Sequence, residues 1–280
     1  MQPVIDHVVY AGPDLDRLRA EFDAVGLPPS YGGEHSNGVT HNYTVGFADL
    51  SYVELISKID PDATSPWWDV QIDENSGPAA WALAVEDVEA ETERLADRGF
   101  AVDGPTHYQR ERPDGELIEW DLTVVGDRDL GTHVPFLLSD RTPRAARVNV
   151  EEDLRATGID GIDRVVVATD DLQASIDTYR RLFDCDPPAT MDDPDFEATL
   201  AHFDGLPMTL ATPLGPDSWL RERVDRFGPL PCAYLLRTTD PEETTAHFDL
   251  SEPTSWVDGT VLWFDLRLPG RVGVFAGSDA

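Results

Sequence analysis

One imidazole and one carboxylate each lie inside an apolar run, where an unpaired charge would be costly. His7 belongs to the run Ile5-Asp6-His7-Val8-Val9, and Glu54 belongs to the run Tyr52-Val53-Glu54-Leu55. Burying an ionised carboxylate without a partner is strongly unfavourable. We therefore predict that His7 and Glu54 are paired. An imidazole and a carboxylate held together can bind a divalent metal or transfer a proton.

Two further polar residues, His35 and Asn42, lie between this pair in the sequence and are the candidate catalytic residues. A catalytic divalent metal needs about three protein ligands and an open position. If His7 and Glu54 are metal ligands, His35 or His41 has to supply the third, and such a set suits manganese, iron or zinc. Alternatively, His35 acts as a general acid-base, or a buried His7 is hydrogen-bonded to Glu54 without any metal.

Arg112 and Trp120 are the candidate substrate-binding residues. An arginine that faces a pocket can bind a carboxylate through two parallel hydrogen bonds, although Arg112 also suits the turn beside Pro113-Asp114-Gly115. Trp120 alternates with Ile118 and Leu122, a pattern that favours packing in the core over stacking on a substrate.

The elements that position these residues form a repeat. The run at Ile5 is followed by a polar turn and an amphipathic helix, and the same pattern returns at Ile162. Weaker copies of this pattern start at Trp81 and at Cys232. Each copy continues into segments in which apolar and polar residues alternate, as they do in strands. We therefore predict an α+β fold of four tandem βαβββ modules, paired into two domains.

The domain boundary is predicted where the chain becomes polar and loses its apolar period. We assign residues 1–142 to a first domain that carries the candidate site, 143–160 to a linker and 161–280 to a second domain.

The composition is strongly acidic, with 54 acidic residues against 21 basic ones and a formal net charge of −33. Salt near 1 M reduces the Debye length to about 3 Å and screens such self-repulsion. We therefore predict a halophilic protein that loses its circular dichroism signal on dialysis into low salt; full retention of structure there would count against this. Neither nucleic acid nor an anionic membrane is expected as a partner.

The two cysteines are too few for a disulfide framework, and the start of the chain has no basic region followed by an apolar stretch. The sequence contains no run of about 18 apolar residues. We expect a cytoplasmic protein, in a high-salt cytoplasm.

The repeat and its motifs resemble a known group of proteins. The residues that carry the resemblance are Ile5-Asp6-His7-Val8-Val9, Gly32-Gly33-Glu34-His35 with Thr40 and Asn42, Tyr52-Val53-Glu54-Leu55, Arg112-Pro113-Asp114-Gly115 with Trp120, and Pro135-Phe136-Leu137-Leu138. The whole chain resembles the vicinal oxygen chelate superfamily, which includes glyoxalase I, extradiol dioxygenases and bleomycin-resistance proteins. The first domain resembles the glyoxalase-like domain family, whereas the second resembles the superfamily only through its first strand and helix.

The resemblance implies that each pair of modules curls its sheet into a half-open cup, with metal ligands on the first and last strands of each module. His7 and Glu54 match these positions in the first module. The second module has Trp81 where a histidine is usual and Phe136-Leu137 near the carboxylate position. In the second domain Arg164 and Thr209 replace the two ligands, so the resemblance implies a degenerate domain there.

Two functions follow from this interpretation. The first is a divalent-metal-dependent lyase, isomerase or dioxygenase that acts on a small oxygen-bearing molecule. The alternative is a metal-free protein of the same fold that binds and sequesters a small molecule without catalysis. The second domain then supports the first or mediates homodimerisation. Glyoxalase activity on a glutathione adduct is not expected, because the ligand set is incomplete.

Overall fold

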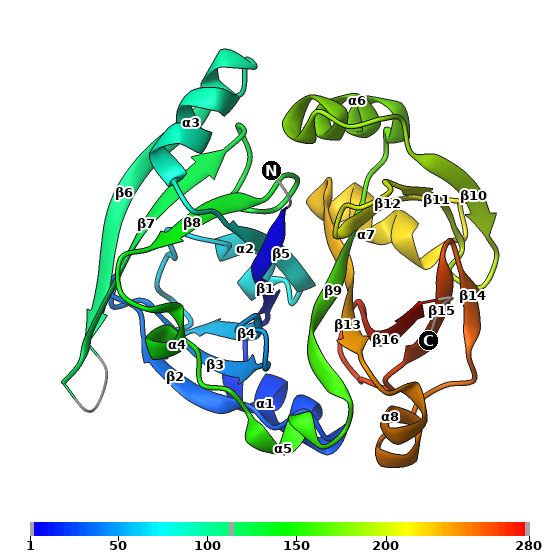
Figure 1. Ribbon diagram of the computed structural model, residues 1–280, viewed down its shortest axis with the longest axis horizontal. Helices are drawn as coiled ribbons and strands as arrows, with labels where there is room; N and C mark the ends of the chain where they lie inside the picture. The colour runs from blue at the N-terminus through cyan, green and yellow to red at the C-terminus, as the bar shows by residue number, and fades with distance from the viewer. Residues whose placement is uncertain (1–2, 112–114, 278–280) are drawn as a thin grey trace.

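A computed structural model describes residues 3–111 and 115–277 of the chain. It contains two mixed eight-stranded sheets, with the orders β2-β3-β4-β1-β5-β8-β7-β6 and β10-β11-β12-β9-β13-β16-β15-β14. Figure 1 shows the two sheets as curled halves that lie side by side, with β9 of the second sheet on the side that faces the first. The predicted α+β class with two half-open curled sheets is therefore confirmed.

The strands follow the predicted modules. Those of the first sheet are β1 (Val4–Ala11), β2 (Ser30–Glu34), β3 (Thr40–Gly46), β4 (Tyr52–Lys58), β5 (Gly77–Ala84), β6 (Val102–Glu111), β7 (Leu117–Val125) and β8 (Phe136–Asp140). Those of the second sheet are β9 (Ile159–Ala168), β10 (Ala189–Asp193), β11 (Ala198–His202), β12 (Met208–Pro213), β13 (Leu230–Thr238), β14 (Thr254–Trp256), β15 (Gly259–Trp263) and β16 (Arg271–Gly277).

In the described residues, each module has one helix after its first strand, and four further helices lie in the connections. The module helices are α1 (Leu15–Ala24), α3 (Val88–Asp97), α6 (Leu172–Phe183) and α8 (Pro241–His247). The connecting helices are α2 (Asp69–Asp73), α4 (Arg144–Arg147), α5 (Glu152–Arg155) and α7 (Trp219–Phe227). No helix in the described part of the chain has the length and apolar character needed to cross a membrane.

The same residue type starts all four module helices. The N-caps are Asp14, Asp87, Asp171 and Asp240, and each carboxylate accepts a hydrogen bond from the backbone N–H three residues further on. An aspartate in extended conformation at this position satisfies an N–H group that the helix itself leaves unpaired. The aspartate therefore determines where the helix begins after the first strand of each module.

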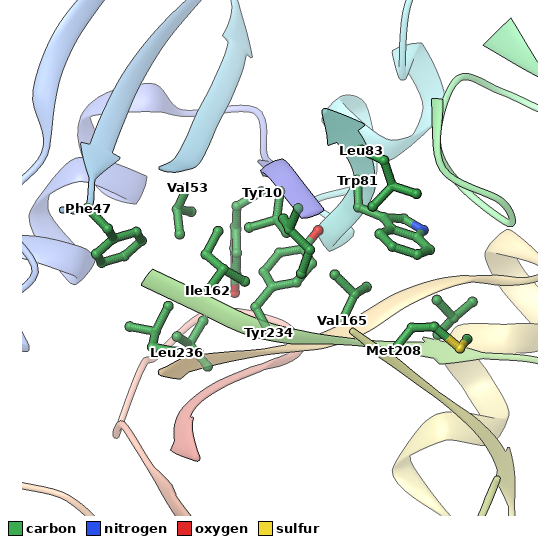
Figure 2. Packing of buried hydrophobic residues seen from close by; sticks show 14 of the residues in the cluster. Tyr10, Phe47, Val53, Trp81, Leu83, Ile162, Val165, Met208, Tyr234 and Leu236 are labelled. Atoms are coloured by element: carbon green, nitrogen blue, oxygen red, sulfur yellow. The ribbon is translucent and has the colours of Figure 1, made fainter. Parts of the chain in front are cut away.

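The two sheets pack back to back through one apolar core. Figure 2 shows Tyr10 and Trp81 from the first sheet facing Ile162, Val165 and Tyr234 from the second. Successive side chains on a strand point to opposite faces. The residues that alternate with this core therefore lie on the concave face of each sheet.

The side chain of Tyr234, on the second sheet, reaches the first sheet at a shift in the pairing of β1 with β5. The pairing of β1 with β5 shifts between Val9 and Tyr10. The Tyr234 hydroxyl lies 2.6 Å from the Val9 carbonyl oxygen and 3.0 Å from that of Ala80, and it accepts a hydrogen bond from the Ala79 N–H at 3.2 Å. The second sheet thus satisfies backbone groups that the shifted pairing leaves free.

Replacing Tyr234 with phenylalanine is expected to lower the free energy of unfolding by about 1–3 kcal/mol, because buried backbone groups lose their partner. Urea unfolding in molar KCl measures this change. Tyr31→Phe is the matched control, since this tyrosine is 52% exposed. A loss for Tyr234→Phe no larger than that of the control would refute the bridging role.

Candidate active site

The concave face of the first sheet holds a cavity of about 100 Å³. It is lined by His7, His35, Ser36, Asn42, Thr44, Tyr52, Glu54, Trp67, Trp68, Tyr108, Gln109, Arg110, Trp120, Leu122, Leu130, Phe136, Leu138 and Arg147. The structure thus brings His7, His35, Asn42, Glu54 and Trp120 to one site. Arg112 lies outside the described residues.

A bulge in β1 places two neighbouring side chains in contact. The pairing with β5 shifts between Ile5 and His7, and bulges of this kind redirect side chains next to functional sites. The His7 Nδ1 atom consequently lies 2.7 Å from Asp6 Oδ1. Because an ionised carboxylate only accepts hydrogen bonds, Nδ1 carries a proton, and in the neutral ring Nε2 is the nitrogen without one.

Asp6 is fully buried and is held in its ionised form by arginines of the segment that joins the two sheets. Arg147 donates to both carboxylate oxygens at 2.9 and 2.7 Å, and Arg144 Nε lies 3.3 Å from Oδ2. Burial by itself would raise the pKa of Asp6, but Arg147 and the hydrogen bond from His7 hold that pKa well below its usual range. The Asp6 carboxylate therefore stays charged and fixes the His7 tautomer.

Glu54 lies on β4, next to β1, and is the second buried carboxylate. Its Oε1 atom accepts hydrogen bonds from Asn42 Nδ2 at 2.5 Å and from His35 Nε2 at 3.1 Å. Its Oε2 atom lies 3.8 Å from His7 Nε2, which is longer than a hydrogen bond. Burial opposes ionisation, yet His35, His7 and Asn42 lower the pKa of Glu54 to about 2.

His35 and Asn42 hold Glu54 from the neighbouring chain segments. The Nδ1 atom of His35 lies 2.8 Å from Thr40 Oγ1, so both ring nitrogens have partners. A Cβ atom at Gly32 would lie 2.2 Å from Asn42 Oδ1. Gly32 is therefore required for this close approach, and the Asn42 amide is packed between β2 and Glu54.

Aromatic rings form the remaining wall of the cavity. The rings of Tyr108 and Trp120 stack with centroids 6.2 Å apart, and Trp67 meets Tyr108 edge-on at 6.0 Å. The His7 ring stacks on Tyr52 at 4.7 Å and meets Phe136 edge-on at 5.3 Å. The side chain of Trp120, for which core packing was favoured, lines this cavity. Such a wall suits a flat, largely apolar molecule.

The two ligand positions of the second module carry no metal donor. Trp81 packs in the core between the sheets, and the cavity side of β5 carries Ala80 and Ala82. Phe136 occupies the corresponding place on β8. Within residues 3–111 and 115–277, no group of three or more His, Cys, Asp or Glu side chains is arranged to hold a metal ion. The donors therefore do not fit the metal site that the resemblance implied.

The equivalent position in the second sheet holds an ion pair. Arg164, which replaces the histidine, donates to both oxygens of Asp258 at 2.9 Å, and His202 Nε2 lies 3.2 Å from the same carboxylate. Thr209, which replaces the carboxylate, lies 3.4 Å from His202 Nδ1. Aromatic residues pack on the concave face of this sheet, namely Phe196, Trp219, Trp256 and Trp263.

Sequence reasoning missed several residues of the site. Asp6 directly precedes His7 in a predicted strand, and the sequence pattern does not indicate that its side chain contacts His7. Arg147 lies in the polar segment assigned to the linker, 141 residues from Asp6. Trp67 and Trp68 form an aromatic pair in a segment without periodicity; that pair was the one local signal available.

A family model described as a glyoxalase-like domain matches residues 5–183, which extend to the end of α6. No curated protein matches the sequence. A hypothetical protein from Staphylococcus aureus has a similar solved structure, with 15% identity, coverage of 96% of this chain and 98% of that chain, and a TM-score of 0.64.

Two enzymes also have similar structures. A mutant of 4-hydroxymandelate synthase from Streptomyces coelicolor is 12% identical, with coverage of 98% and 93% and a TM-score of 0.60. The Mn(II)-bound glyoxalase from Novosphingobium aromaticivorans is 13% identical, with coverage of 96% and 80% and a TM-score of 0.58. At these identities the likeness shows a shared fold.

Proposed function

Because this chain belongs to the glyoxalase-like domain family of the vicinal oxygen chelate superfamily, we propose that its first sheet holds the active site of a proton-transferring enzyme. The substrate is a small flat molecule with an oxygen-bearing group, and the reaction is of the lyase or isomerase kind. The observation that carries this proposal is the Asp6–His7 pair at the polar end of an aromatic cavity.

His7 is the residue that moves the proton in this proposal. Its side chain lines the cavity, and Asp6 keeps the ring in the tautomer that carries the Nδ1 proton. Two carboxylates flank the ring: Asp6 Oδ1 lies 2.7 Å from Nδ1, and Glu54 Oε2 lies 3.8 Å from Nε2. Glu54 itself is a weak base because its pKa is lowered to about 2. It therefore acts as a permanent anion that His35 and Asn42 hold in place.

A metal-dependent reaction, with manganese, iron or zinc, is the competing candidate. An imidazole oriented by a carboxylate, with its other nitrogen free, also occurs around bound metals. His7 and Glu54 supply two ligands, so a third is needed. His35 would have to give up its hydrogen bond to Glu54 in order to provide it. Non-catalytic binding by the aromatic wall is the other alternative.

The second domain is proposed as a support for this site. Besides Tyr234, the buried Arg223 of α7 donates hydrogen bonds to the carbonyl oxygens of Ser76 and Pro78, at the start of β5. These contacts hold β5, which pairs with β1 and therefore with His7.

The experiment is proton exchange in D2O and molar KCl, with a panel of small aryl ketones that carry an acidic C–H bond next to the carbonyl group, both with and without a carboxylate on the ring. We expect the folded protein to accelerate deuterium incorporation into at least one compound, as followed by proton NMR. The same protein unfolded by urea is the control. If panel compounds bind but exchange no faster than in buffer, the enzymatic proposal is wrong and the binding alternative stands.

A further inference from the structure

The two free edges of the first curled sheet meet at one arginine. Strands β2 and β6 lie at the opposite ends of the strand order, and Figure 1 shows them on the outer side of this half. Arg110 on β6 donates a hydrogen bond from Nη1 to the Gly32 carbonyl oxygen on β2 at 2.7 Å. Arg110 also lines the cavity, so its guanidinium lies where the curled sheet closes on itself.

The surface next to this guanidinium is aromatic. Tyr108 lies two residues before Arg110 on the same strand, so both side chains point to the cavity side. Trp120 pairs with Tyr108 across the strands and stacks on it, and Trp67 completes the wall. All three rings are partly exposed. A flat ring can therefore pack against them while a substituent reaches Arg110.

The charged residues of the cavity favour the binding of a ligand with one anionic group, which would lie at Arg110. Arg147, the other arginine of the cavity, is bound to both Asp6 and Asp140. The described partner of Arg110 is an uncharged carbonyl, which uses one of the five N–H donors of a guanidinium. Glu54 is ionised within the same cavity and would repel an anion placed beside it.

Arg110 also provides a local positive charge in a strongly acidic protein. The protein carries a formal net charge of −33, which disfavours the approach of any anionic ligand. A guanidinium beside the cavity supplies local attraction and can bind a carboxylate through two parallel hydrogen bonds.

We propose that Arg110 is the residue that sets substrate specificity and that the substrates are planar aromatic carboxylates. The carboxylate pairs with Arg110, the ring packs on Trp67, Tyr108 and Trp120, and an uncharged polar group reaches His7. This inference rests on the proposed function, because it names the substrate class of the same cavity.

The test compares benzoate with benzamide, which has nearly the same shape and no charge. NMR titrations in molar KCl measure both affinities for the wild type, Arg110→Gln, Arg110→Lys and the control Arg141→Gln. Glutamine keeps a donor for Gly32 without the charge, and Arg141 pairs with Asp121 on the surface. We expect the wild type and the control to bind benzoate at least about ten-fold more tightly than benzamide.

Arg110→Gln is expected to bring this ratio to about one by weakening benzoate alone, and lysine is expected to restore part of it. Three results would overturn the inference. The wild type could bind benzoate and benzamide with equal affinity, or it could fail to bind benzoate. Arg110→Gln could also lose affinity for both compounds by the same factor. The titrations involve no turnover. If the wild type prefers benzoate to benzamide as expected but catalyses no proton exchange, only the enzymatic proposal is refuted. If it catalyses exchange but does not prefer benzoate, only the substrate class is refuted.

Discussion

Replacing His7 with asparagine is expected to lower the rate of proton exchange by roughly 10²–10⁴-fold, the usual contribution of a general acid-base. The asparagine side-chain N–H can still donate to Asp6, as His7 Nδ1 does at 2.7 Å. The variant lacks the Nε2 atom, which takes up and releases the proton in the proposed reaction. The buried Asp6 therefore keeps a partner, and the loss should appear in the chemical step rather than in folding.

Exchange rates in D2O at saturating substrate measure this effect, and circular dichroism in molar KCl verifies the fold. His107→Asn is the matched control, because that side chain is 40% exposed and is not among the residues that line the cavity. If His7→Asn is folded and exchanges as fast as the wild type, His7 is not the residue that moves the proton.

Replacing Arg147 with methionine is expected to lower the free energy of unfolding by about 3–5 kcal/mol, the range for removing one partner of a buried ion pair. The Arg147 side chain is 5% exposed and binds the fully buried Asp6 through two hydrogen bonds. Its removal leaves that carboxylate with Arg144 and His7 as partners. The desolvation of a buried charge is then poorly compensated.

Urea unfolding in molar KCl measures the loss, with Arg141→Met as the control. Arg141 pairs with Asp121, but its side chain is 57% exposed, so we expect a change within about 1 kcal/mol. Equal losses for the two variants would contradict a structural role for the Asp6–Arg147 pair.

The fold was predictable because its signals are local and repeated. An aspartate N-cap starts the helix of every module. Apolar alternation in β1 and β4 also indicates which residues face the core between the sheets. The sequence of β6 is apolar only at its start, Val102, because Gly104-Pro105 and the charged residues after it break the apolar pattern. Strand β6 is an edge strand, where proline is tolerated.

The site was predictable only where burial and charge conflict within a short segment. Glu54 among apolar neighbours required a partner, and His7, His35 and Asn42 all lie around it. Alternation alone would place Asp6 on the face opposite His7, and the bulge in β1 removes that separation.

Other parts of the site depend on contacts that no local pattern contains. The pairing of Asp6 with Arg147 joins a strand to a segment without periodicity. Trp81 is one residue out of register with the cavity face of β5, so its side chain lies in the core instead. A shift of one residue in a strand moves a side chain to the other face. Sequence spacing alone did not resolve that shift.

The central claim is that His7, hydrogen-bonded to Asp6, belongs to an acid-base site rather than to a metal centre with Glu54. Elemental analysis of protein purified in molar KCl without chelator or affinity metal, and after soaking with manganese, iron or zinc, tests this most directly. We predict far less than stoichiometric metal in the wild type, with the same background in His7→Ala and Glu54→Ala. Near-stoichiometric metal in the wild type that both variants lose would contradict the account.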